Sequence, residues 1–116
     1  MDEPIRTRLT AALRGAMKAR DAAAVAPLRS ALAALDNAQA VDAVVATVEH
    51  ESFAGTAGGL GAGEVPRALL EEEQARAIVA REAQERRDAA DEYERLGQSD
   101  EVARLRAEAD LLTSFV

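Results

Sequence analysis

Apolar residues recur at spacings of three and four in four separate stretches of the chain. This spacing places their side chains along one face of an α-helix. The sequence therefore predicts an all-α fold built from four helices. In chain order the apolar faces consist of Ile5, Leu9, Leu13 and Met17; of Val25, Leu28, Leu32 and Leu35; of Leu70, Ile78, Val79, Tyr93 and Leu96; and of Val102, Leu105, Ala109 and Leu112.

Residues typical of helix ends separate these stretches. Asp21 is a suitable N-cap for the second helix and Ser99 for the fourth, while Gly97 is a natural C′ residue after the third. Because both joints are short, we expect each neighbouring pair to form an antiparallel helical hairpin. The predicted architecture is one domain with a first hairpin in residues 1–40 and a second in residues 67–116, together a four-helix arrangement.

The segment 41–66 between the two hairpins contains five closely spaced glycines. Such a run does not sustain a helix, because each Gly costs about 1 kcal/mol relative to Ala. The valines at its start are compatible with one or two further helical turns or with a short extended piece. We interpret 41–66 as a Gly-rich linker, with a partner-contacting loop as the alternative. A phosphate-binding loop is disfavoured because no Lys-Ser/Thr pair follows the glycines.

The chain has few of the side chains that catalysis and metal binding use. It contains no Cys and one His, His50, which excludes thiolate catalysis, disulfides and paired-His metal sites. The acidic clusters at 71–73 and 88–92 are interpreted as solvated helix faces, the first at a helix N-terminus where carboxylates favour the dipole. We therefore predict no catalytic residues, no cofactor and no metal.

The net charge of −7 is unevenly distributed. Residues 1–40 hold six basic and four acidic side chains, whereas the remainder holds eight basic and seventeen acidic ones. Non-specific binding of nucleic acid depends on neutralised phosphates, so only the first 40 residues could supply such a surface. The N-terminus lacks a signal-peptide pattern, and no stretch approaches the roughly 20 apolar residues of a membrane span. We expect a cytoplasmic protein without membrane contact.

Glu82 and Arg86 occupy positions on the apolar face of the third predicted helix. One interpretation is i,i+4 ion pairing along a surface helix, worth about 0.2–0.5 kcal/mol per pair. The other is that the two side chains meet a partner or a buried polar group. Drift of the helical periodicity over a long helix favours the surface interpretation.

Two further patterns resemble the YqeY-like proteins of the GatB/YqeY domain family. Residues 16–21 read AMKARD and are followed by Leu28-Arg29 and Leu32, similar to the family signature AMKAKD…LR…L. Residues 86–97 read RRDAADEYERLG, similar to the family's Arg-rich helix ending in EYEKAGR. The likeness covers most of the chain outside the linker, and the linker itself is longer and richer in glycine than in the family.

The resemblance implies a relationship to the C-terminal helical region of the B subunit of tRNA-dependent amidotransferases. It implies a non-catalytic accessory module whose contacts with tRNA or with an amidotransferase-like protein involve Lys18, Arg29, Arg86 and Arg87. The glutamine-dependent carbon–nitrogen ligase activity attached to the family would then belong to the larger enzyme. The alternative is a protein-interaction module or homodimer with no role in nucleic-acid binding.

Overall fold

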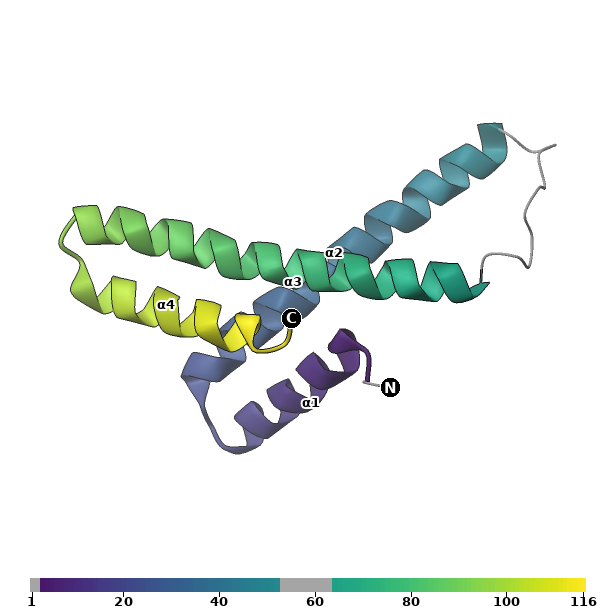
Figure 1. Ribbon diagram of the computed structural model, residues 1–116. Coiled ribbons are helices and arrows are strands. Elements are labelled where there is room, and N and C mark those ends of the chain that lie inside the picture. The colour runs from purple at the N-terminus through teal and green to yellow at the C-terminus, as the bar shows by residue number, and fades with distance from the viewer. Residues whose placement is uncertain (1–2, 53–63) are drawn as a thin grey trace.

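The computed structural model describes residues 3–52 and 64–116, and these residues form four helices and no strand. They are α1 (Ile5–Lys18), α2 (Ala22–Ser52), α3 (Glu64–Arg95) and α4 (Ser99–Thr113) (Figure 1). The prediction of an all-α chain with four helices is confirmed.

The helices α2 and α3 are longer than the sequence predicts. We expected the linker to begin at residue 41 and the third helix near residue 67, whereas α2 continues to Ser52 and α3 begins at Glu64. Residues 41–52 contain neither Gly nor Pro, so nothing in them terminates a helix that is already formed. The glycines lie in 53–63, outside the described residues.

The turn between α1 and α2 ends the first helix with a residue in the left-handed region. The N–H of Asp21 donates to the carbonyl of Ala16, and Arg20 has φ of 58°. This is the Schellman motif, in which Gly usually occupies the left-handed position. Asp21 then caps α2, since its Oδ1 accepts from the N–H of Ala24 at 3.2 Å. The predicted N-cap role of Asp21 is confirmed.

The turn between α3 and α4 repeats that geometry with glycine. Gly97 has φ of 72°, and the N–H of Gln98 donates to the carbonyl of Tyr93 at 2.9 Å. The prediction that Gly97 ends the third helix is confirmed. Ser99, predicted as the next N-cap, is instead the first helical residue, and Gln98 precedes it without a side-chain cap.

The core lies where the helices cross. α1 packs along α2, and α3 packs along α4, with α2 contacting both α3 and α4. Buried alanines bring the helix axes close together, and larger side chains fill the space between them. The main cluster comprises Ile5, Leu9, Ala16, Leu28, Ala31, Leu35, Val79, Ala83, Ala109 and Leu112. A second cluster of Ala90, Val102 and Leu105 joins α3 to α4 nearer their connecting turn.

The molecule is elongated because two helices extend beyond this core. Its radius of gyration is 17.8 Å, compared with about 13 Å for a compact domain of similar length. Figure 1 shows the C-terminal half of α2 and the N-terminal half of α3 diverging from their crossing point. Every residue of α2 from 41 to 48 is exposed.

Candidate macromolecular contact surfaces

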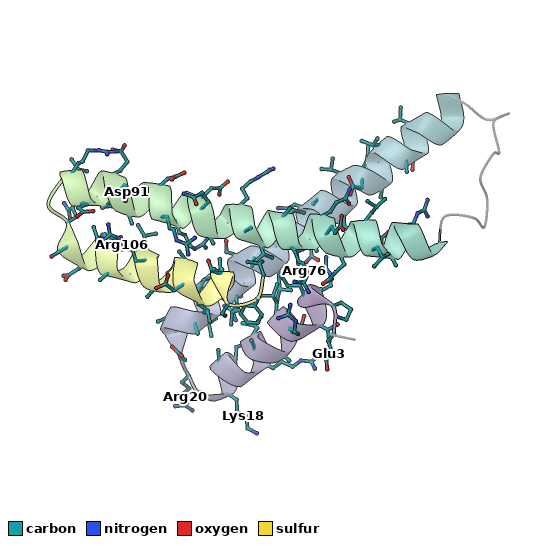
Figure 2. The ribbon with its side chains drawn as sticks, viewed as in Figure 1. Glu3, Lys18, Arg20, Arg76, Asp91 and Arg106 are labelled. Atoms are coloured by element: carbon teal, nitrogen blue, oxygen red, sulfur yellow. The ribbon has the colours of Figure 1, made fainter. Side chains whose placement is uncertain are left out.

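The end of the molecule at the α1–α2 turn carries exposed cations. Lys18 lies in the last turn of α1, and Arg29 on α2 reaches back to it, with its Nη2 3.9 Å from Sδ of Met17. Arg14, Lys18, Arg20 and Arg29 are all exposed. Figure 2 shows Lys18 and Arg20 extending from the turn into solvent. Two of the four predicted contact residues, Lys18 and Arg29, therefore lie at one accessible end. We call these four cations the basic end.

Arg20, one of the four cations of the basic end, has an unfavourable backbone conformation. A side chain at φ of 58° crowds the following carbonyl, which costs roughly 1–2 kcal/mol for most residues. No other described non-glycine residue has positive φ. Sequence reasoning missed Arg20, although its position, just after Lys18 and before an N-cap, is where a helix-ending glycine is expected.

Arg86, the third predicted contact residue, is directed inward. Its side chain is 15% exposed and lies between α3 and α4. Its Nε donates to Oε1 of Glu108 at 3.0 Å, and its Nη1 donates to the carbonyl of Glu82 at 3.1 Å and to its Oε1 at 3.2 Å. The interpretation of Glu82 and Arg86 as a surface pair is thus wrong. Arg86 meets a buried polar group, the carboxylate of Glu108, and holds Glu82 beside it.

The Arg86 cluster, made of Ser30, Glu82, Arg86, Arg104 and Glu108, connects three helices. The hydroxyl of Ser30 on α2 donates to Oε1 of Glu82 at 2.8 Å, and Nη1 of Arg104 donates to Oε2 of Glu108 at 3.1 Å. Hydrogen bonds from Arg104 raise the pKa of Arg104 above its ordinary value, with the bond to Glu101 having the larger effect and the bond to Glu108 the smaller.

The position of the Arg86 cluster explains its burial. On α3, Arg86 falls between Ala83 of the main apolar cluster and Ala90 of the second, and on α4 Glu108 falls between Leu105 and Ala109. No buried side-chain nitrogen or oxygen among the described residues lacks a hydrogen-bond partner. A satisfied polar layer therefore separates the two apolar clusters and sets the register of α4 on α3.

Arg87, the fourth predicted contact residue, also faces α4. Its Nη2 donates to Oγ1 of Thr113 at 2.7 Å and lies 3.7 Å from Oδ1 of Asp110. Its side chain is 37% exposed. The structure therefore does not bring the four predicted residues onto one surface, because Arg86 and Arg87 hold α4 while Lys18 and Arg29 face solvent.

Glu72 of the first acidic cluster makes contacts within the protein, whereas the other members of the two clusters are exposed, as predicted for solvated helix faces: Glu71, Glu73, Asp88, Asp91 and Glu92. Both carboxylate oxygens of Glu72 accept from the N–H of Ile5, at 3.2 and 3.1 Å, and Arg76 holds Glu72 from one turn away. The carboxylate of Glu72 was expected to stabilise the N-terminus of its own helix. The structure shows it at the N-terminus of α1 instead, where it supplies the cap that Pro4 lacks.

A surface depression near the N-terminal end of α1 is lined by Glu3, Arg8, Arg76, Ser114, Phe115 and Val116. Arg8 spans it, donating to the carbonyl of Phe115 at 2.7 Å with its guanidinium 5.8 Å from that ring. No His or Cys lines this depression, and no three acidic or His side chains among the described residues gather as metal ligands.

The projecting half of α2 presents an apolar surface. Val41, Val44, Val45 and Val48 are between 47% and 63% exposed, and we call them the valine stripe. Counted from Ala22 to Val48, α2 reaches a mean hydropathy of 1.2 over 18 residues, long and apolar enough to cross a membrane. The expectation that no stretch approaches a membrane span is therefore too strict. The indication is weak, since length and composition alone carry it and Leu28 and Leu35 pack in the core.

No protein-family model, curated protein or solved structure matches the chain.

Proposed function

We propose that this chain is a non-catalytic, cytoplasmic helical module that contacts tRNA through the basic end. The observation that carries the proposal is the placement of Arg14, Lys18, Arg20 and Arg29, four exposed cations at one end of a chain whose net charge is −7. Phosphate contacts supply most of the affinity of non-specific nucleic-acid binding. The acidic α3 and α4 would repel the same polyanion and so orient it toward the basic end.

The backbone of Arg20 supports a role for this surface in binding. A glycine at this left-handed position would relieve the strain, yet the chain carries a cation there. By contrast, Arg86 and Arg87 bond to α4, and we do not propose that they touch tRNA. Lys18 and Arg29 are the contact residues that the resemblance implies, Arg14 lies one turn before Lys18 on the same helix, and Arg20 is included because it is exposed at the same end.

The YqeY-like resemblance supplies the biological setting of the proposal. It suggests an accessory role beside a glutamine-dependent tRNA amidotransferase, with the ligase chemistry in the partner enzyme. In this setting the helical pairs α1–α2 and α3–α4 act as two antiparallel hairpins, joined by the Gly-rich part of 41–66.

Fluorescence anisotropy with labelled tRNA tests the proposal, comparing the native chain with a Lys18→Ala/Arg29→Ala variant. We expect binding at low salt that weakens as salt is raised. The slope of the logarithm of the binding constant against the logarithm of the salt concentration should be less steep for the variant. The difference should be about 1 for each phosphate that a removed cation no longer neutralises. The matched control is Arg67→Ala/Arg81→Ala, which removes the same charge from exposed positions on α3. Absence of binding at low salt, or equal weakening in both variants, contradicts the proposal.

A protein-interaction module is the second candidate function, and the exposed apolar surface of α2 favours it. Its partner would be an amidotransferase-like protein or another copy of the chain. Pull-down with the native chain and with a Val45→Asp variant tests this candidate, because a partner that binds through this surface should be absent from the variant's pull-down. Equal capture by both proteins would contradict it.

A further inference from the structure

Met17 is an exposed methionine that the core does not use. It lies in the last turn of α1, and its side chain is 49% exposed, whereas Ile5 and Leu9 on the same helix are fully buried. Met17 is the one methionine among the described residues. Exposure makes its thioether accessible to soluble oxidants, and methionine sulfoxide is a common product of their reaction with proteins.

The sulfur of Met17 lies within the basic end. It accepts a long hydrogen bond from Nη2 of Arg29 at 3.9 Å, a contact that joins the last turn of α1 to α2. Thioether sulfur is a weak acceptor. Among the described residues no carboxylate forms an ion pair with Arg29. The guanidinium is therefore restrained only weakly, and it can turn toward a phosphate.

Oxidation converts this weak acceptor into a strong one. The sulfur of Met17 attacks the terminal oxygen of a hydroperoxide, so that an S–O bond forms and the O–O bond breaks. Two electrons pass from sulfur to the peroxide, and the second oxygen takes up the proton of the transferred oxygen and leaves as water or an alcohol. The product is methionine sulfoxide, which methionine sulfoxide reductases return to the thioether.

The added oxygen fits between the sulfur and Arg29. A hydrogen bond from N–H to oxygen spans about 2.7–3.2 Å, and 3.9 Å separates Nη2 from the sulfur itself. An oxygen bonded to the sulfur and directed toward Arg29 therefore lies within hydrogen-bond distance, and neither helix has to move. Hydrogen bonds from a charged donor are about twice as strong as those between neutral groups. The sulfoxide thus restrains the guanidinium more firmly than the thioether does.

We propose that Met17 is a reversible oxidation site of the basic end, at which a hydroperoxide produces a sulfoxide that holds Arg29. The consequence for tRNA rests on the proposed function. A phosphate must compete with the sulfoxide oxygen for the guanidinium, so oxidation weakens binding by about three- to tenfold for an exposed pair of this kind. The fold is retained, because Met17 lies outside both buried clusters.

Peptide mapping after treatment with hydrogen peroxide tests the oxidation site without tRNA. Trypsin cleaves after Arg14 and Lys18 and releases residues 15–18, so Met17 and Met1 are recovered in separate peptides. We expect Met17 to oxidise in the folded chain at a rate close to that in the urea-unfolded chain, and the helical circular dichroism to be unchanged. Strong protection of Met17 in the folded chain, or loss of the helical signal on oxidation, overturns the proposal.

A double-mutant cycle tests the contact with Arg29. Oxidation should lower the urea midpoint more in Arg29→Ala than in the native chain, because the sulfoxide oxygen then lacks its donor. In fluorescence anisotropy, oxidation should weaken tRNA binding by the native chain and by the matched control Lys18→Ala, but should not weaken it further in Arg29→Ala. Met17→Leu, which retains Met1, should keep its tRNA affinity after peroxide treatment.

Equal responses of Arg29→Ala and Lys18→Ala to oxidation, in both assays, overturn the proposal. Full loss of affinity in peroxide-treated Met17→Leu does so as well, because the oxidation that matters would then lie elsewhere. Absence of tRNA binding by the unoxidised native chain contradicts the proposed function and not the oxidation site, which peptide mapping and the urea midpoints test without tRNA.

Discussion

Replacement of Arg86 by Met is expected to cost the protein a large part of its stability. The substitution keeps the aliphatic length of the side chain and removes the guanidinium. Two carboxylates are left facing the gap, those of Glu82 and Glu108, whose side chains are 18% and 10% exposed. A buried carboxylate without its cation is poorly solvated, so both groups oppose folding in the variant.

The magnitude follows from the partners that remain. Removing one member of a fully buried ion pair costs about 3–5 kcal/mol. In this cluster Glu82 keeps the hydroxyl of Ser30 at 2.8 Å, and Glu108 keeps Arg104 at 3.1 Å. These contacts offset part of the loss, and we expect the free energy of unfolding to fall by about 2–3 kcal/mol, or the melting temperature by about 10 °C.

Urea unfolding followed by circular dichroism measures this change. Arg81→Met serves as control, since Arg81 is on the same helix but exposed, and its effect should stay within about 0.5 kcal/mol. Adding Glu108→Gln to Arg86→Met should recover at least about 1 kcal/mol relative to additive losses, because one uncompensated carboxylate is removed. If Arg86→Met costs no more than Arg81→Met, the cluster does not hold α4 on α3 and the reasoning fails.

Four further substitutions test the turns, the cap and the core. Arg20→Gly should raise the free energy of unfolding by about 0.5–1 kcal/mol and Gly97→Ala should lower it by about 1 kcal/mol, both measured by urea unfolding, because each residue is left-handed. Equal signs would contradict this explanation. Glu72→Ala should weaken the cap of α1 by about 1 kcal/mol and accelerate hydrogen exchange at the amide of Ile5. Unchanged exchange at that amide would exclude the cap. Leu28→Ala should cost about 3 kcal/mol in thermal unfolding, since the side chain is 1% exposed, and a loss below about 1 kcal/mol would mean that the core is looser than described.

The four helices could be predicted because local signals in the sequence agree with one another. The 3–4 spacing places Leu28 and Leu112 on apolar faces, and both are buried in the main cluster. Gly97 marks the end of α3 because a left-handed residue there favours glycine. The end of α2 was harder to place. Valine-rich residues 41–48 lack a core-directed stripe, so the periodicity is lost while the helix continues to Ser52.

The contact residues were only partly predictable, because a sequence pattern gives the face of a helix but not what lies opposite it. Arg86 lies on the apolar face of α3, and that placement alone fits both a surface pair and a buried cluster. The decisive residue is Glu108 on α4, 22 positions away, three residues after Leu105 and four before Leu112, and therefore beside the same buried face. Read together, an Arg on one apolar face and a Glu on the next predict a buried ion pair. Lys18 and Arg29 are instead exposed, which is why we propose that these cations, and not Arg86, contact an external anion.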